Sequence, residues 1–282
     1  MKIDSIIFIL LISLSANTCI ASRNDTDQAY EFGVLPYLAP VRLESMYGPA
    51  VSEISRLLNR KVYLRTSTSS EKYFANLQQS AFDLAVVNPF DSVPAQEQFG
   101  YIAIAARSQH HCSIYTLPQS PIQQFDNLRR KVIGVASPRS PITFYTTRLL
   151  NQQDLRAGID VELKPYPTTH ACLHALIVGD ISACGASTIT ADIFRHQRGI
   201  ELRELAQCEE FPGMVFLVHS RLPVTERKLL RQTILNWSST ENGITLLNTI
   251  GPHTRFVSYS PENFKNIRIH YEEWKAIDSA TP

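Results

Sequence analysis

The amino-acid sequence predicts an α/β protein of two lobes, each a mostly parallel sheet flanked by helices, joined by two hinge crossings. Short apolar strands alternate with amphipathic helices, which is the pattern of parallel sheets covered by helices. The pattern occurs twice, over about 100 residues each time, as expected for two lobes. At 282 residues, the chain is long enough to give each lobe a hydrophobic core.

The first unit follows a polar stretch and begins with a short strand that Pro36 ends. Its second element is a helix on which Val51, Ile54, Leu57 and Leu58 share one face. Expected strands are 31–35, 61–65, 82–87 and 101–106, and expected helices are 47–58 and 69–79, the latter with Ser70 as its N-cap.

The second unit repeats this order. Expected strands are 131–136, 161–163, 181–186 and 201–207, and expected helices are 144–150 and 168–178. Two apolar runs, 112–117 and 213–218, are interpreted as connections, with hinges near 107–111 and 209–213, and the chain after Leu222 is helical again. Residues 22–107 plus 214–282 would then form lobe I, and residues 108–213 would form lobe II.

Residues 1–21 have the pattern of a signal peptide. Lys2 precedes the apolar segment 6–14, which is too short to cross a bilayer and is followed by small residues. A lipid anchor at Cys19 is disfavoured, because Asn17 and Thr18 fit poorly before a lipidated cysteine. We expect a periplasmic protein that meets the membrane only through a partner, or through that disfavoured anchor.

Four cysteines follow the signal peptide, and an oxidising compartment permits two disulfides or leaves buried free thiols. Cys172 lies one turn into a predicted helix and Cys184 late in the next strand, so a Cys172–Cys184 bridge is favoured. A Cys112–Cys208 bridge is less favoured, because it would cross near the hinge and restrain closure.

Several classes of function are disfavoured. A formal net charge of +1 without a basic cluster disfavours nucleic-acid binding. No hydrolase, metalloprotease or phosphate-loop motif and no acid/base pair is visible, so we expect neither catalytic residues nor a cofactor. His170 and His174 share a helical face and His110 adjoins His111, but Cys172 points elsewhere, so a metal or metalloid site is disfavoured too.

Three colinear segments, 80–90, 126–135 and 169–183, carry a family resemblance. The first segment is a strand with an Asp before apolar residues and leads to Asn-Pro-Phe, the second contains Asp-Asn-Leu-Arg-Arg-Lys-Val before a strand, and the third is a helix that opens with Thr-His and ends in Gly-Asp. They resemble the phosphate, phosphite and phosphonate-binding proteins of ABC importers. The resemblance implies a type II periplasmic binding protein fold. It also implies capture of a small ligand, such as an oxyanion, in an interlobe cleft and its delivery to an ABC permease. The alternative output is a sensor that presents the bound solute to a membrane histidine kinase.

In this fold the cleft lies where strand ends and helix N-termini of both lobes meet, and such helix ends suit an anion. Asn88 could equally belong to an Asn-Pro turn and Ser140 could equally cap a helix. The expected ligand-binding residues are Tyr37, Asn88, Phe90, Ser137, Ser140, Thr143, Thr169 and His170.

One departure from the family bears on the ligand. The lobe II loop, which resembles a Ser-Thr-Ser-Gly loop that holds phospho-oxygens in the family, reads Ser140-Pro141-Ile142-Thr143. Pro141 lacks an N–H and Ile142 lacks a hydroxyl, so two anion donors are lost. We therefore expect weak binding of phosphonates and a preference for a smaller, less charged or partly apolar solute, held by Tyr37, Phe90, Ser140, Thr143 and His170.

Overall fold

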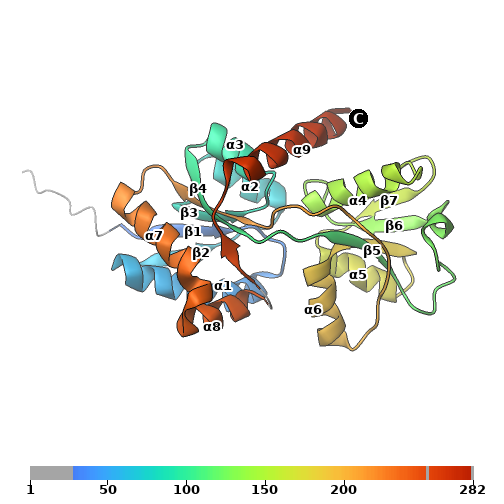
Figure 1. Ribbon diagram of the computed structural model, residues 1–282, viewed down its shortest axis with the longest axis horizontal. Coiled ribbons are helices and arrows are strands. Elements are labelled where there is room, and N and C mark those ends of the chain that lie inside the picture. The colour runs from blue at the N-terminus through green and yellow to red at the C-terminus, as the bar shows by residue number, and fades with distance from the viewer. Residues whose placement is uncertain (1–27, 252–253, 281–282) are drawn as a thin grey trace, which may run out of the picture.

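The chain folds into two α/β lobes that lie side by side, as the sequence predicted (Figure 1). This computed structural model describes residues 28–251 and 254–280. The predicted signal peptide and Cys19 lie outside the described residues. None of the helices in the described part of the chain is long and apolar enough to cross a membrane.

Lobe I is built on a six-stranded sheet with the strand order β11-β4-β10-β3-β1-β2. Its strands are β1 (Tyr30–Val34), β2 (Val62–Arg65), β3 (Leu84–Val87), β4 (Tyr101–Arg107), β10 (Val215–His219) and β11 (Phe256–Val257). Its helices are α1 (Pro40–Leu58), α2 (Ser70–Gln78), α3 (Ser92–Glu97), α7 (Val224–Asn236), the short η3 (Trp237–Ser239) and α8 (Glu241–Ile250).

Lobe II is built on a five-stranded sheet with the strand order β7-β6-β8-β5-β9. Its strands are β5 (Cys112–Thr116), β6 (Val132–Val135), β7 (Glu162–Pro165), β8 (Ala183–Ser187) and β9 (Arg203–Gln207). Its helices are the short η2 (Phe125–Leu128), α4 (Pro141–Gln152), α5 (Thr169–Ile177) and α6 (Thr188–Arg198).

Helix starts follow local capping chemistry. Helix α1 begins at Pro40, seven residues before the predicted start, because proline at the first helical position loses no hydrogen bond. Helix α2 is capped by Ser69, whose side chain accepts from the Lys72 N–H, rather than by Ser70. Helix α6 has no counterpart among the predicted elements; the Ser187 side chain caps it and Gly199 ends it in the left-handed conformation.

Both sheets are mixed, which corrects the expectation of mostly parallel sheets. Strand β10 lies between β3 and β4 and is antiparallel to both, and β5 is antiparallel to both β8 and β9. The two apolar runs interpreted as connections are therefore the interior strands β10 and β5. The reason is that a chain entering a lobe from the other lobe arrives at the edge where β1, β3, β6 and β7 end, so it must run in the opposite direction.

The two crossings between the lobes lie at 108–111 and 208–214, between β4 and β5 and between β9 and β10. They run antiparallel next to each other. His110 and Phe211 exchange backbone hydrogen bonds of 3.0 and 2.9 Å, and the Arg107 N–H donates to the Met214 carbonyl over 2.8 Å. The hinge is thus a two-stranded ribbon.

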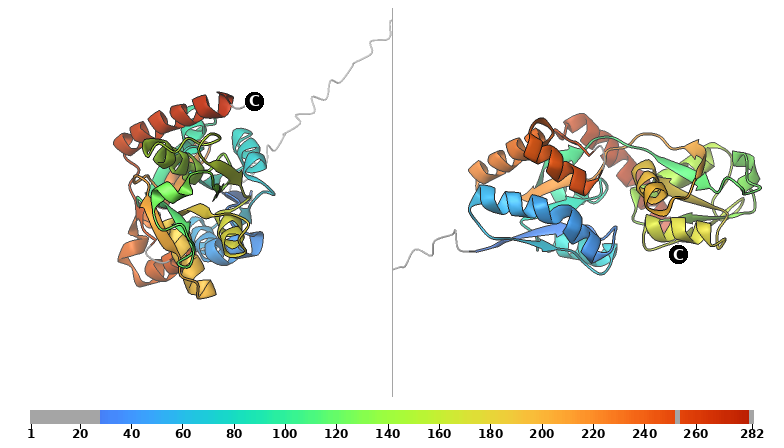
Figure 2. Two further views of the ribbon diagram at one scale, coloured as in Figure 1. Left: turned by 90° about the vertical axis from the view of Figure 1, so that its right-hand side faces the viewer. Right: turned by 90° about the horizontal axis from the view of Figure 1, so that it is seen from below.

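The C-terminal helix α9 (Pro261–Ala280) contacts both lobes, although it was expected to belong to lobe I. It runs along the top of the molecule toward α4 (Figures 1 and 2). Arg268 pairs with Glu97 of α3 at 3.2 Å, whereas His270 and Glu273 bond Tyr145 and Arg148 of α4. Helix α9 therefore crosses the interlobe boundary.

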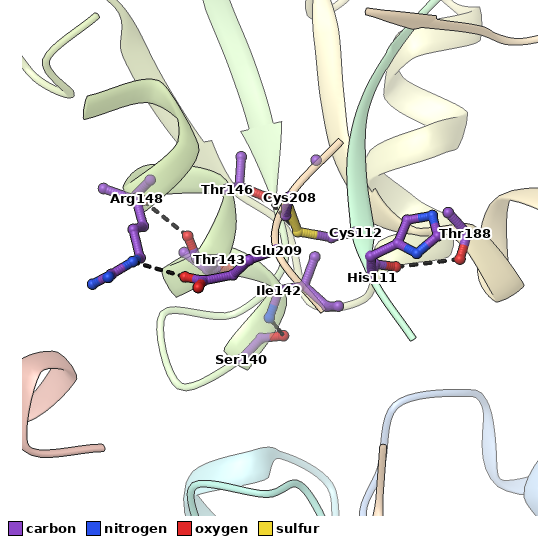
Figure 3. Close-up of a disulfide and its surroundings, with 12 residues drawn as sticks. His111, Cys112, Ser140, Ile142, Thr143, Thr146, Arg148, Thr188, Cys208 and Glu209 are labelled. Carbon is purple, nitrogen blue, oxygen red and sulfur yellow. Dashed lines mark hydrogen bonds and ion pairs between the residues drawn. A yellow bond between two sulfur atoms is a disulfide. The ribbon is translucent and has the colours of Figure 1, made fainter. Parts of the chain in front are cut away.

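Two disulfides are present. The predicted Cys172–Cys184 bridge joins α5 to β8, with a Cα–Cα distance of 6.0 Å. Cys112 and Cys208 form the second bridge, with a Cα–Cα distance of 5.2 Å, where β5 begins and the chain leaves β9 (Figure 3). This pairing was the less favoured one, and its presence corrects that expectation. The bridge lies beside the hinge, as expected, where the chain enters and leaves lobe II. It closes the base of the lobe.

Candidate functional site: an interlobe pocket

A pocket of about 330 Å³ lies between the lobes. Residues from both lobes line it, and several helix starts contribute to its wall: Arg42 near the start of α1, Ser70 of α2, Ile142 of α4, His170 of α5 and Thr190 of α6. These helices follow strands whose carboxyl ends face the other lobe, which is the usual position of a ligand site in open α/β sheets. Residues at the hinge, among them His110, Phe211 and Met214, also line the pocket.

The wall is cationic. Its residues include Arg42, Arg107, Arg139, His110 and His170, and no aspartate or glutamate is among the described residues that line it. Within the described part of the chain, Arg139 is the one arginine of the wall that pairs with a carboxylate. Its Nη2 lies 2.6 Å from Oδ1 of Asp91, a residue that is 2% exposed. Together with the partial positive charge of the helix starts, this composition favours a negatively charged ligand.

At one end of the pocket Arg42 of lobe I faces His170 of lobe II. Burial, together with the nearby Arg42 and Arg198 guanidinium groups, lowers the pKa of the His170 imidazole. Its Nδ1 atom is buried and has no hydrogen-bond partner among the described residues. Cationic and neutral donor groups from the two lobes therefore line this part of the pocket, and none of the described lining residues is a carboxylate.

At the hinge end the pocket is lined by Arg107 and His110. Burial and the Arg107 charge lower the pKa of His110 to about 4, so the ring is neutral near pH 7. The Arg107 Nη2 donates to Thr254 Oγ1 over 2.6 Å. A Cβ at Gly251 would lie 3.2 Å from that nitrogen, so the glycine leaves room for the guanidinium.

Tyr37 lies near Arg107 and forms a hydroxyl pair with Tyr47 at 3.2 Å. Burial raises the pKa of the Tyr37 phenol well above its usual value, so the hydroxyl stays neutral. The phenol can donate to a ligand oxygen, as the sequence suggested. The rest of the wall is largely apolar and includes Leu35, Leu38, Met46, Ile142, Ile189, Ile193, Met214 and Ile250.

Six of the eight predicted ligand-binding residues come together at this pocket: Tyr37, Asn88, Ser137, Ser140, Thr169 and His170. Asn88 also forms the turn that was its alternative role. Its Oδ1 accepts from the Asp91 N–H over 2.9 Å, and its Nδ2 donates to Asp91 Oδ2 over 2.6 Å. These bonds orient Asp91 toward Arg139.

Phe90 and Thr143 do not line the pocket. Phe90 is buried in an interlobe aromatic cluster, with ring centroids 5.3 Å from Phe144 and 6.0 Å from Trp274. The Thr143 hydroxyl donates to the carbonyls of Ala136 and Ser137 at 3.0 Å each. Phe90 faces the other lobe as predicted, but its ring is covered by apolar side chains instead of facing a cavity.

The first turn of α4 has no free backbone donor for a ligand. Pro141 has no N–H, the Ile142 N–H donates to Ser140 Oγ over 3.2 Å, and the Thr143 N–H donates to the Ser140 carbonyl over 3.0 Å. Figure 3 shows Ser140 and Ile142 at this helix start. Ser140 thus has the capping role that was its alternative.

Four cationic or neutral nitrogen groups of the pocket were missed by sequence reasoning: Arg42, Arg107, Arg139 and His110. Arg107 and His110 belong to the expected hinge and Arg139 lies between two predicted site residues, but Arg42 belongs to no segment that sequence reasoning singled out. The positions of Arg42 and Arg107 next to strand ends could have identified them, because Arg42 lies in the first turn of the helix after β1 and Arg107 is the last residue of β4.

The fold and the pocket together define a two-lobed protein that encloses a ligand between its lobes. Residues 32–264 match the family described as ABC transporter, phosphonate, periplasmic substrate-binding protein, and the chain belongs to that family. No curated protein matches the sequence. The family description agrees with the resemblance and the periplasmic location that the sequence predicted.

Solved structures share the fold at low identity. A binding protein component of an ABC phosphonate transporter from Pseudomonas aeruginosa has a TM-score of 0.75 at 10% identity, with 90% of each chain covered. PhnD1 from Prochlorococcus marinus, in complex with methylphosphonate, has a TM-score of 0.76 at 16% identity, covering 88% of this chain and 98% of its own. The aliphatic sulphonate binding protein SsuA from Escherichia coli has a TM-score of 0.65 at 14% identity, covering 90% of this chain and 94% of its own.

Proposed function

We propose that this protein captures a small organic anion with an apolar body in the interlobe pocket and delivers it to an ABC importer. The observation that carries the proposal is the pocket wall, which combines three arginines and two histidines with apolar side chains and has no carboxylate among its described residues. The family is one of transport binding proteins, which supports delivery over catalysis. The comparisons give no support to the sensor alternative.

An anion would stabilise the closed arrangement of the lobes. Arg42 and the donors at the start of α5 come from opposite lobes. A negatively charged group between them is attracted to both, so the ligand has a higher affinity for the closed state and shifts the equilibrium toward it. The same linkage raises the stability of the folded protein when ligand is present.

The ligand differs from phosphate and from small phosphonates in this proposal. A tetrahedral dianion needs many donors to offset its desolvation, and the first turn of α4 has no free N–H to offer. The pocket also has more room than phosphate fills, since about 330 Å³ is the lower end of the range for organic-ligand sites. Side chains such as Met46 and Ile189 would cover an apolar body.

We expect organic sulfonates or carboxylates with an apolar body to bind the mature protein and to raise its melting temperature. Phosphate and methylphosphonate should bind at least about tenfold more weakly, a difference of about 1.4 kcal/mol. Isothermal titration calorimetry with both sets of anions checks this. Sub-micromolar binding of phosphate or methylphosphonate would refute the ligand preference, and no binding by any organic anion would refute the proposed function.

The variant P141T/I142S tests the reason for this preference. It restores one N–H and two hydroxyls at the start of α4, so phosphonate affinity should rise while the binding of other anions changes little. The single variant P141A restores the N–H without either hydroxyl and serves as a matched control. An unchanged phosphonate affinity in P141T/I142S would show that this loop is not what weakens phosphonate binding.

Anion binding should strengthen as the pH falls. The pKa of His170 in the free protein lies below its ordinary 6.5, and a bound anion raises it, so binding takes up a proton. The extra affinity for the anion is fully present below the pKa that His170 has in the free protein. It is lost as the pH rises through the pKa that His170 has in the complex, and the total loss is about tenfold for each unit by which these two pKa values differ. Calorimetry in two buffers of different ionisation enthalpy measures the uptake, which His170→Gln should abolish. Equal affinities from pH 5 to 8 without proton uptake would contradict this role.

A further inference from the structure

Two separate arginine–histidine pairs line the pocket. Arg42 and His170 form one pair, and Arg107 and His110 form the other. Among the described residues, no carboxylate lies within ion-pair distance of either arginine, and the buried Nδ1 of His170 has no hydrogen-bond partner. One small anionic group needs only one such pair, so the second pair is unexplained by the proposed function.

The sheet topology separates the two pairs. Strands β1 and β4 end at the same edge of the lobe I sheet, and β3 and β10 lie between them. Three strand spacings of about 4.8 Å place the ends of β1 and β4 roughly 14 Å apart. Arg107 is the last residue of β4, and Arg42 lies on the helix that follows β1. The long arginine side chains can shorten this separation, but their backbones belong to different strand ends of the sheet.

The electrostatic neighbours of the histidines agree with this separation. The charges that lower the pKa of His170 are those of Arg42 and Arg198, whereas the charges near His110 are those of Arg107 and His111. The pocket wall also includes apolar side chains such as Met46 and Met214. It therefore offers a ligand two separate cationic groups together with apolar side chains.

We infer that the natural ligand carries two anionic groups joined by an apolar chain, with one group held by Arg42 and His170 and the other by Arg107 and His110. This inference rests on the proposed function and narrows its ligand class to elongated organic dianions. It is compatible with weak binding of phosphate, because the two charges of an elongated dianion are far apart and each has its own cationic partner.

A length series on the wild-type protein tests the inference. The probes are α,ω-dicarboxylates from glutarate to azelate and α,ω-alkanedisulfonates, each paired with the monocarboxylate or monosulfonate of the same chain length. We expect a two-headed probe to bind at least about tenfold tighter than its one-headed partner, with an optimum at one chain length. Equal affinities within every pair would overturn the inference and leave the proposed function standing. No binding by any probe would refute the proposed function itself.

Two single variants assign the ends. R42Q and R107Q should each reduce the best dianion to about the affinity of the monoanion, whereas monoanion binding should suffer in only one of them. R56Q is the matched control, because Arg56 lies on the same helix as Arg42 but is exposed and paired with Glu53 at 2.9 Å. Thermal unfolding of each variant without ligand verifies that it folds. Equal losses for monoanion and dianion in both arginine variants would overturn the two-ended arrangement.

Discussion

Replacing both Cys112 and Cys208 with alanine is expected to lower the free energy of unfolding by about 4 to 5 kcal/mol. The bridge spans a sequence separation of 96 and joins the point where the chain enters lobe II to the point where it leaves. In the loop-closure account, a cross-link restricts the unfolded chain more strongly as the loop grows longer. Both residues are buried, so reductant should reach this bridge only after the lobe opens.

The second disulfide provides the matched control. Cys172 and Cys184 are also buried, but their separation is only 12, so C172A/C184A should cost about 3 kcal/mol. Urea unfolding of both double variants, followed by circular dichroism, gives the comparison. A larger loss for the short loop than for the long one would contradict the loop-length argument. Because the bridge lies within one lobe, C112A/C208A should still bind ligand where it remains folded.

Asp91→Asn is expected to destabilise the protein by about 3 to 5 kcal/mol, the range for breaking a buried ion pair by removing one partner. Asp91 is braced by Asn88 in lobe I and pairs with Arg139 in lobe II. Burial raises the pKa of the Asp91 carboxyl, and the adjacent Arg139 counteracts this by favouring the charged form. The neutral amide would leave the Arg139 guanidinium without its counter-charge.

Arg139 is held at this place by aromatic rings as well. Its guanidinium lies 4.1 Å from the ring centroid of Phe74 and 5.3 Å from that of Trp274, whose Nε1 donates to the Pro138 carbonyl over 3.1 Å. Because these contacts join lobe I, lobe II and α9, Asp91→Asn should also loosen the lobes. Small-angle X-ray scattering of the ligand-free variant should then give a larger radius of gyration than that of the wild type.

Two further variants separate these effects. Glu53→Gln breaks the exposed pair with Arg56 and should leave the free energy of unfolding almost unchanged, because solvent screens exposed pairs. The double variant D91N/R139M removes the unpaired charge, so it should recover part of the stability that D91N loses. Unfolding in urea measures all three. A loss for D91N no larger than that for Glu53→Gln would show that the interlobe pair contributes little.

The predicted site residues that line the pocket are mostly those at the ends of secondary-structure elements. Tyr37 follows β1, and Thr169 and His170 open α5, and all three line the pocket because the ends of neighbouring parallel strands meet at one edge. Prediction was less accurate for Phe90. An aromatic residue at a strand end can line a cavity or enter an apolar cluster, and only the position of α4 and α9 determines which occurs.

The sequence by itself determined the alternation of strands and helices, the two-lobed class, the loss of donors at Pro141 and Ile142 and the Cys172–Cys184 bridge. These features depend on periodicity, residue chemistry and contacts between consecutive elements, all of which are local along the chain. The direction of β5 and β10, the place of α9 and the pairing of Asp91 with Arg139 were decided only by the tertiary structure. The pairs Arg42–His170 and Arg107–His110 belong to this second group, because their charges come from segments that only the packing of the two lobes brings to one pocket. Long polar side chains carry no periodic signal, so their partners are set by the relative positions of whole elements.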